Sequence, residues 1–197
     1  METCPLKIVA GSRPHYAETE NGDAWSVSHF PGLCRISLID GLGHGPYAAS
    51  ATAVALQTLK SLGPVQPAEV IRRCNLALSG TRGVVMGVAN IDLRDSSVAY
   101  AAVGNTDGLI RIGDEGVTTR LLSDRGIVGT TLPTIRSVVI PLQEPWQLLL
   151  FTDGVRDRFN VRDELQAEAE SSNWPAEFLE RWGRTHDDAT VILVSPR

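Results

Sequence analysis

The amino-acid sequence predicts an α+β fold in which antiparallel strands pack against helices that lie outside the sheet. The main evidence is a run of segments in the middle of the chain whose apolar residues alternate with a period of two. Pairs of segments with a helical pattern lie on either side of this run, at residues 47–78 and 163–183. The order lacks the regular alternation of strand and helix that is typical of a parallel sheet.

The N-terminal part of the chain predicts three strands followed by two helices. The third strand is rich in aliphatic residues and ends at Asp40, and the first helix ends before Gly63. The second helix has Pro67 in its first turn, and its apolar residues recur at helical spacing. Because a short turn joins the two helices, we expect them to pack side by side. The expected bounds are residues 5–13, 23–30 and 33–40 for the strands and 47–62 and 67–78 for the helices.

The rest of the chain predicts further strands, two more helices and a final strand. Residues 83–93 and 96–105 flank a short turn and should form a β-hairpin. We interpret Asp107-Gly108 as the turn of a second hairpin, since Asp-Gly is first of all a turn signal. The other expected elements are strands at residues 108–113, 136–142 and 146–154, helices at 163–172 and 175–183, and a strand at 189–194.

The composition is that of an ordinary globular protein. With 197 residues, 43% of them hydrophobic and 21% charged, the chain can bury a sizeable core, and we expect one domain over residues 1–197. The 18 basic and 23 acidic residues give a net charge of −5, and the basic residues are scattered along the chain. This pattern disfavours nucleic acid and membrane surfaces as partners.

The cysteines and the N-terminal residues predict a cytoplasmic protein. Cys4, Cys34 and Cys74 are widely spaced and odd in number, which is typical neither of a disulfide framework nor of a zinc site. Cys34 and Cys74 lie in apolar patterns, so we expect both to be buried. The sequence shows no signal peptide, and no apolar run approaches the ~20 residues of a membrane helix.

Aspartates mark the ends of several predicted strands. They are Asp23, Asp40, Asp153 and the neighbouring pair Asp187 and Asp188. One such residue by itself is most simply a cap or a turn residue. A charge placed beside the core, however, needs a cation or several hydrogen-bond donors. Because carboxylate and carbonyl oxygens suit Mg²⁺ and Mn²⁺, the whole set indicates a site for a divalent cation.

Four motifs, taken in order, resemble the motif series of the PPM (type-2C-like) family of metal-dependent serine/threonine protein phosphatases. They are Gly22-Asp23, DGLGHG at 40–45, FTDGV at 151–155 and DDATVILV at 187–194. The sequence is most similar to the SpoIIE/RsbU branch of that family. Its short length and its Gly104-Asn105 pair resemble the RsbX-type stressosome phosphatases. The resemblance implies an αββα sandwich, in which two antiparallel sheets lie face to face and helices flank them.

The resemblance also implies a centre with two divalent metal ions, Mn²⁺ or Mg²⁺. By position in the motifs, Asp40 would bridge both ions and Gly41 would offer its backbone carbonyl. Asp23 would bind one ion, and Asp153 and Asp187 would bind the other. The implied reaction is hydrolysis of phosphoserine or phosphothreonine by direct attack of a water that bridges the two ions. The implied partners are phosphorylated STAS-domain proteins of a bacterial stress-signalling pathway, either stressosome components or anti-anti-sigma factors.

Several assignments stay open at this point. Asp187 is preferred to Asp188 because the first aspartate of the pair matches the family's ligand, but the register could differ by one. His44 is a candidate general acid for the leaving oxygen, and it could equally form only hydrogen bonds within its turn. Arg13 is the only early candidate for a phosphate-binding arginine, and its spacing is unconvincing. The substrate-binding residues are therefore unknown.

Two other functions compete with the phosphatase. A domain of this kind without metal ions would be a catalytically silent module that binds phosphoproteins. The stretch DGLGHG also resembles the D-x-G-x-G box of GHKL-type ATPases and kinases. That interpretation leaves Asp153 and Asp187 without a role, so we favour an active phosphatase.

Overall fold

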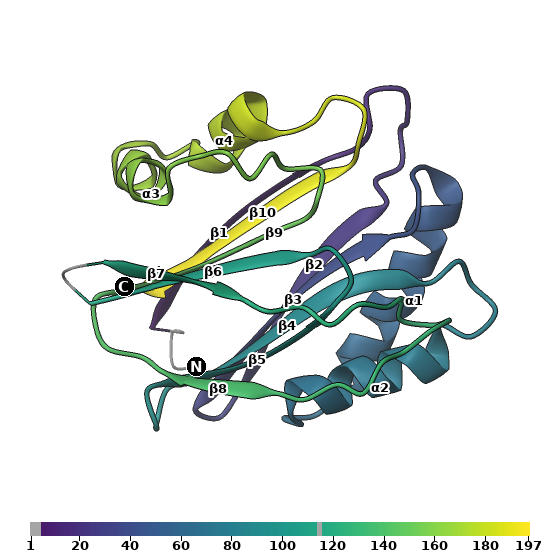
Figure 1. The fold of residues 1–197 in the computed structure, drawn as a ribbon, viewed down its shortest axis with the longest axis horizontal. Coiled ribbons are helices and arrows are strands. Elements are labelled where there is room, and N and C mark those ends of the chain that lie inside the picture. The colour runs from purple at the N-terminus through teal and green to yellow at the C-terminus, as the bar shows by residue number, and fades with distance from the viewer. Residues whose placement is uncertain (1–4, 114–115) are drawn as a thin grey trace.

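Two five-stranded antiparallel sheets lie face to face in the computed structural model, which describes residues 5–113 and 116–197 (Figure 1). In spatial order, the first sheet contains β1 (Leu6–Arg13), β10 (Ala189–Pro196), β9 (Trp146–Phe151), β6 (Asp107–Ile112) and β7 (Val117–Leu121). The second sheet contains β2 (Asp23–Phe30), β3 (Leu33–Gly41), β4 (Val84–Asp92), β5 (Ser97–Val103) and β8 (Val138–Pro141). The expected α+β class and its two antiparallel sheets are confirmed.

Helices cover the outer face of each sheet, and this confirms the αββα arrangement (Figure 1). The helices α1 (Pro46–Ser61) and α2 (Pro67–Ala77) pack against the second sheet, and they lie side by side as predicted. The helices α3 (Val161–Glu170) and α4 (Trp174–Trp182) cover the first sheet.

The long apolar runs of the central strands arise because both faces of those strands are buried. Leu38 of β3 and Leu150 of β9 point between the sheets, where they belong to one cluster. Their neighbours Ile39 and Leu149 belong instead to the clusters beneath the helices. Since successive side chains of a strand point to opposite faces, a strand with helix on one side and sheet on the other needs apolar residues throughout.

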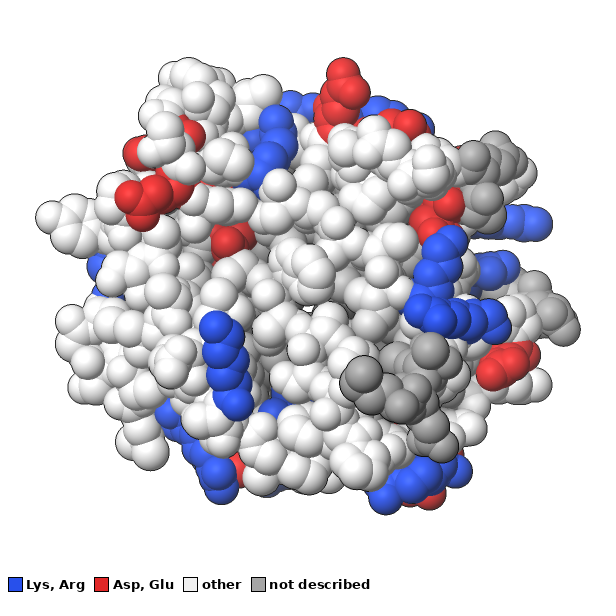
Figure 2. Space-filling model, turned by 180° about the vertical axis from the view of Figure 1, so that it is seen from behind, with Lys and Arg blue, Asp and Glu red and all other residues white. Residues whose placement is uncertain are grey.

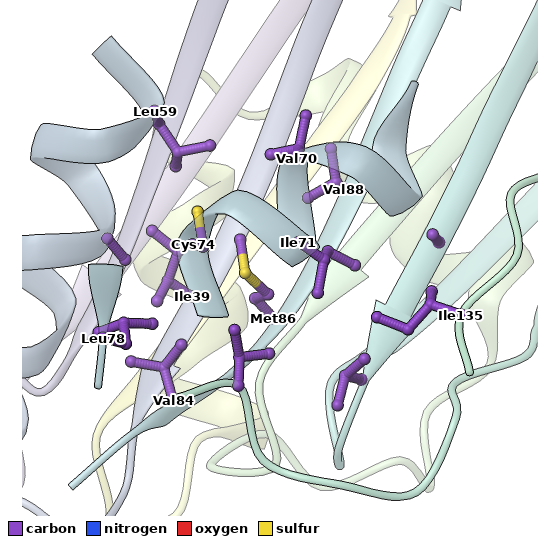
Figure 3. Close-up of a cluster of buried hydrophobic side chains, with 14 of the residues drawn as sticks. Ile39, Leu59, Val70, Ile71, Cys74, Leu78, Val84, Met86, Val88 and Ile135 are labelled. Atoms are coloured by element: carbon purple, nitrogen blue, oxygen red, sulfur yellow. The ribbon is translucent and has the colours of Figure 1, made fainter. Parts of the chain in front are cut away.

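Beneath α1 and α2, apolar side chains of the helices pack against apolar side chains of the second sheet (Figure 3). Val70, Ile71 and Cys74 of α2 are fully buried against Met86 and Val88 of β4. The expected burial of Cys34 and Cys74 is confirmed, whereas Cys4 lies outside the described residues. Burying one such aliphatic side chain contributes about 1.5–3 kcal/mol to folding.

Two details of the strand prediction were wrong. Asp107-Gly108 is not a hairpin turn, because β5 and β6 lie in different sheets and the chain crosses from one to the other between them. Asp107 is the first residue of β6 and pairs with Phe151 of β9. Strand β7 was missed because four of its five residues are exposed, which leaves only a weak apolar alternation.

The charged side chains are distributed over the surface much as they are scattered along the sequence. Figure 2 shows one face on which charged side chains of both signs are scattered among uncharged residues. In the described part of the chain, no helix combines the length and the apolar character that crossing a membrane requires.

Candidate functional site

The topology brings the predicted aspartates to one end of the sandwich. Asp23 begins β2 and Asp40 lies near the end of β3, and the antiparallel register places these two residues directly opposite each other. In the first sheet, Asp153 follows β9 and Asp187 precedes β10, its antiparallel neighbour. Strand ends that are distant in sequence therefore meet because each pair of neighbours runs in opposite directions.

A pocket of about 570 Å³ opens at this end of the molecule. Asp40, Asp153 and Asp187 line it together, and Asp23 lies buried beside them. Its other lining residues are Leu42, Gly43, His44, Val85, Gly104, Asn105, Arg125, Gly126 and Ile127. The pocket thus joins carboxylates of both sheets to the Gly-rich segment after β3 and to the segment between β7 and β8.

The carboxyl groups of this site repel one another in a poorly hydrated place. Burial raises the pKa of Asp40 from 3.8 to about 9, and the charges of Asp23, Asp153 and Asp187 add to the rise. Burial also raises the pKa of Asp23 to about 7, although the nearby hydroxyls of Thr152 and Thr190 act in the opposite direction. A bound cation would offset this repulsion and favour the ionised carboxylates.

The aspartates of the pair at the start of β10 have different surroundings. Asp187 is partly buried and lines the pocket. The pKa of Asp187 is raised, mainly by burial and to a smaller extent by the charge of Asp153. Asp188 is buried, and its Oδ1 accepts a hydrogen bond of 2.8 Å from the backbone N–H of His15. The geometry therefore favours Asp187 as the residue that faces a ligand in the pocket.

His44 lines the pocket and is held by groups outside its own turn. Its Nδ1 lies 2.8 Å from Oε1 of Glu18, and its ring stacks on that of His15 with centroids 4.5 Å apart. His186 lies near this group and meets Tyr16 edge to face at 5.0 Å. A carboxylate that fixes one ring nitrogen is the usual arrangement around a histidine that transfers protons at the other. The sequence alone did not reveal Glu18, since it lies in a loop before β2.

Three further residues of the site were missed in the sequence. Asn105 donates a hydrogen bond to Asp153 Oδ2, and Thr152 donates one of 2.7 Å to Asp23 Oδ2. Arg125 contributes a cationic side chain to the pocket. Arg13, which we left out of the site, lies against Gly183 near the C-terminus of α4 instead. No motif pointed to Arg125 because its segment has no regular pattern.

The donor set fits a divalent cation that prefers oxygen ligands. Oδ1 of Asp23 and Oδ2 of Asp188 are buried and have no hydrogen-bond partner in the described part of the chain. A buried carboxylate oxygen in this condition is costly unless a cation compensates it. Within residues 5–113 and 116–197, no group of three or more His, Cys, Asp or Glu side chains is close enough together to hold a metal ion as it stands. The carboxylates thus surround one pocket without closing into a coordination sphere.

The raised pKa values predict how the stability of the metal-free protein depends on pH. Above pH 4 the unfolded chain has released the protons of both carboxyl groups, whereas the folded protein keeps the proton of Asp23 up to about pH 7 and that of Asp40 up to about pH 9. The free energy of unfolding should therefore fall as the pH rises, by about 1.4 kcal/mol for each unit of pKa shift that is crossed. We expect denaturant titrations in chelator to give lower stability at pH 8 than at pH 5.

The matched variants for this measurement are Asp40→Asn and Asp95→Asn. The first removes the group with the largest shift and should flatten the pH dependence, whereas the second changes an exposed aspartate in the turn after β4 and should leave it unchanged. A wild-type stability that stays level or rises between pH 5 and pH 8 would contradict the electrostatic description of the site.

A comparison with protein families finds a match over most of the chain. The model of Stage II sporulation protein E (SpoIIE) matches residues 31–197. A comparison with curated proteins finds no significant match.

Solved structures with similar folds include three informative ones. A chain from work on the bacterial stressosome, described as a modular system adapted to control secondary messenger signalling, has 27% identity and a TM-score of 0.88, with 96% of this chain and 98% of that chain covered. RsbX in complex with magnesium has 19% identity and a TM-score of 0.86, with coverages of 100% and 98%. The catalytic domain of the serine/threonine phosphatase PstP with two manganese ions has 16% identity and a TM-score of 0.66, with coverages of 96% and 97%.

Proposed function

Since the chain belongs to the SpoIIE family, whose domains have the PPM phosphatase fold, we propose that it is a metal-dependent protein serine/threonine phosphatase. The observation that carries the proposal is the convergence of Asp23, Asp40, Asp153 and Asp187 at one pocket. Such a set of oxygen donors suits hard divalent cations such as Mg²⁺ and Mn²⁺. RsbX with magnesium and PstP with two manganese ions share the fold, and they support the choice of Mg²⁺ or Mn²⁺.

In the proposed centre, Asp40 and the backbone carbonyl of Gly41 hold the ions from the second sheet, together with Asp23. Asp153 and Asp187 hold them from the first sheet. When bound, the ions supply a nucleophilic water near neutral pH and offset charge on the phosphoryl oxygens. The chain itself contributes the shape of the pocket, the orientation of its carboxylates and the groups that meet the substrate.

Two side chains at the pocket are suited to contact the substrate. Arg125 can bind a phosphoryl oxygen, since the guanidinium matches the geometry of phosphate. Its backbone is well anchored, because Asp124 exchanges hydrogen bonds with Ala102 and Gly104, and Val128 with Val84. We propose that His44, which lines the pocket and is held by Glu18, gives a proton to the leaving serine or threonine oxygen.

Arg125→Gln should weaken binding of phosphorylated substrates. A hydrogen bond between charged groups contributes about 1.5–3 kcal/mol, so we expect KM to rise about tenfold or more, with a smaller change in kcat. Arg136→Gln is the control, since Arg136 is an exposed arginine of the same segment outside the pocket lining. Steady-state kinetics on a phosphothreonine peptide measure both variants, and equal KM values for them would exclude Arg125 from the binding site.

We propose phosphorylated STAS-domain proteins, as stressosome components or anti-anti-sigma factors, as the substrates. The similarity to a chain from the bacterial stressosome and to RsbX supports this class. The test is phosphate release from a phosphothreonine-bearing STAS protein, a generic phosphothreonine peptide and a phosphotyrosine peptide. We expect the STAS protein to react fastest and the phosphotyrosine peptide slowest. Binding of the STAS protein without turnover under any metal would instead indicate a catalytically silent module.

A further inference from the structure

Asp23 belongs to a closed ring of hydrogen bonds at the end of the sandwich that carries the aspartates. The Thr152 hydroxyl donates to Asp23 Oδ2 at 2.7 Å and accepts from the backbone N–H of Thr190 at 3.0 Å. The Thr190 and Ser12 hydroxyls are 2.6 Å apart, and Asn21 Nδ2 donates to Ser12 Oγ at 2.7 Å. The Asn21 side-chain oxygen completes the ring by accepting from the backbone N–H of Asp23 at 2.9 Å.

The ring joins the two sheets at the end that carries the aspartates. Asp23 belongs to β2 of the second sheet, whereas Thr152 follows β9 and Thr190 lies on β10, both in the first sheet. Thr152 and Thr190 are fully buried, and Asp23 is only 6% exposed. Direct hydrogen bonds in so dry a place are stronger than at the surface, and leaving one of them unmade is costly.

The ring also determines which oxygen of Asp23 is available. Because the Thr152 hydroxyl has a single proton and accepts from Thr190 N–H, that proton goes to Asp23 Oδ2. Oδ1 of the same carboxylate is buried and has no hydrogen-bond partner among the described residues. Thr152 is β-branched and thus stiff at χ1, so its hydroxyl is a fixed point against which the carboxylate is oriented.

We propose that Thr152 is a positioning residue that holds the Asp23 carboxylate with Oδ1 free to bind a divalent cation. The proposal rests on the proposed function, in which Asp23 is a metal ligand. Hydrogen bonds from neighbours to a ligating carboxylate fix its orientation, and their loss typically lowers metal affinity by about 10–100-fold. Thr152 therefore acts on the metal through Asp23 and does not touch it.

The matched variants are Thr152→Val, Thr152→Ser and Ser12→Ala. Valine has nearly the shape of threonine but neither donates nor accepts, whereas serine keeps both hydrogen bonds. Ser12→Ala removes a hydroxyl of the same ring that does not contact Asp23. Isothermal titration calorimetry with Mn²⁺ measures the affinity of each folded variant without any need for turnover. Unfolding in chelator measures the stability of each variant separately.

We expect Thr152→Val to bind Mn²⁺ at least about tenfold more weakly than the wild type, and Thr152→Ser and Ser12→Ala to stay within about threefold of it. A Thr152→Val protein that is less stable in chelator but binds Mn²⁺ normally would overturn the proposal, since Thr152 would then only tie the sheets together. Equal losses of affinity in the valine and serine variants would overturn it as well. A wild type that binds neither Mn²⁺ nor Mg²⁺ would overturn the proposed function itself, and the proposal with it.

Discussion

Asp40→Asn is expected to abolish phosphatase turnover while the protein stays folded. Asp40 lies close enough to Asp23, Asp153 and Asp187 for the charges of all three to raise its pKa. Because Asp40 is central to the proposed ligand set, its loss should disrupt the binding of both proposed ions. A loss of about 4 kcal/mol of transition-state stabilisation corresponds to a rate reduction of about a thousandfold. The measurement is phosphate release at saturating Mn²⁺, beside circular dichroism and thermal unfolding of the same sample.

Asp95→Asn is the matched control for this variant, because it makes the same chemical change in an exposed turn outside the pocket. It should keep the turnover of the wild type. If Asp40→Asn retained more than about a tenth of the wild-type rate, Asp40 would not be a ligand of both ions. If it failed to fold in chelator, Asp40 would be required for the fold itself and not only for binding the ions.

Gly154→Ala is expected to disrupt the junction between β9 and β10. A Cβ at Gly154 would lie 1.7 Å from the backbone carbonyl oxygen of Asp188, and a backbone atom cannot yield as a flexible side chain can. The segments that carry Asp153 and Asp187 would have to separate. We expect the free energy of unfolding to fall by about 3 kcal/mol or more and Mn²⁺ affinity to fall with it.

Denaturant unfolding and calorimetry check this prediction, with Gly63→Ala as the control. Apart from its chain neighbours, no atom of the described residues lies within 4 Å of a Cβ at Gly63, so this substitution should change stability by at most about 0.5 kcal/mol. A Gly154→Ala protein as stable as the control would show that the two segments are not packed as tightly as the structure indicates.

Much of the fold was predictable because strand and helix patterns are local. The bounds of β2 and the pairing of α1 with α2 follow from periodicity and from the stop signal at Gly63. The partition of strands between two sheets did not follow from local pattern. Asp107-Gly108 has the appearance of a turn, but a turn signal does not say whether the next strand returns to the same sheet.

Some residues of the candidate site were likewise predictable from the sequence, and others were not. Its aspartates were visible because each one lies at the end of a predicted strand, and the order of their motifs resembled that of a known family. Arg125, Glu18 and Thr152 were not visible as site residues, since their roles depend on contacts between segments far apart in sequence. Thr152, for example, meets Asp23 across 129 positions of the chain. Irregular segments supply such residues, and no periodicity marks them.

We have proposed that the acidic end of the sandwich is a metal-dependent catalytic centre. Its most direct test is phosphate release from a phosphothreonine peptide by the wild-type protein, first in chelator and then as Mn²⁺ or Mg²⁺ is added back. We expect no turnover in chelator and full recovery when either ion is restored. Turnover that persists in chelator, or its absence at every concentration of both ions, would contradict it.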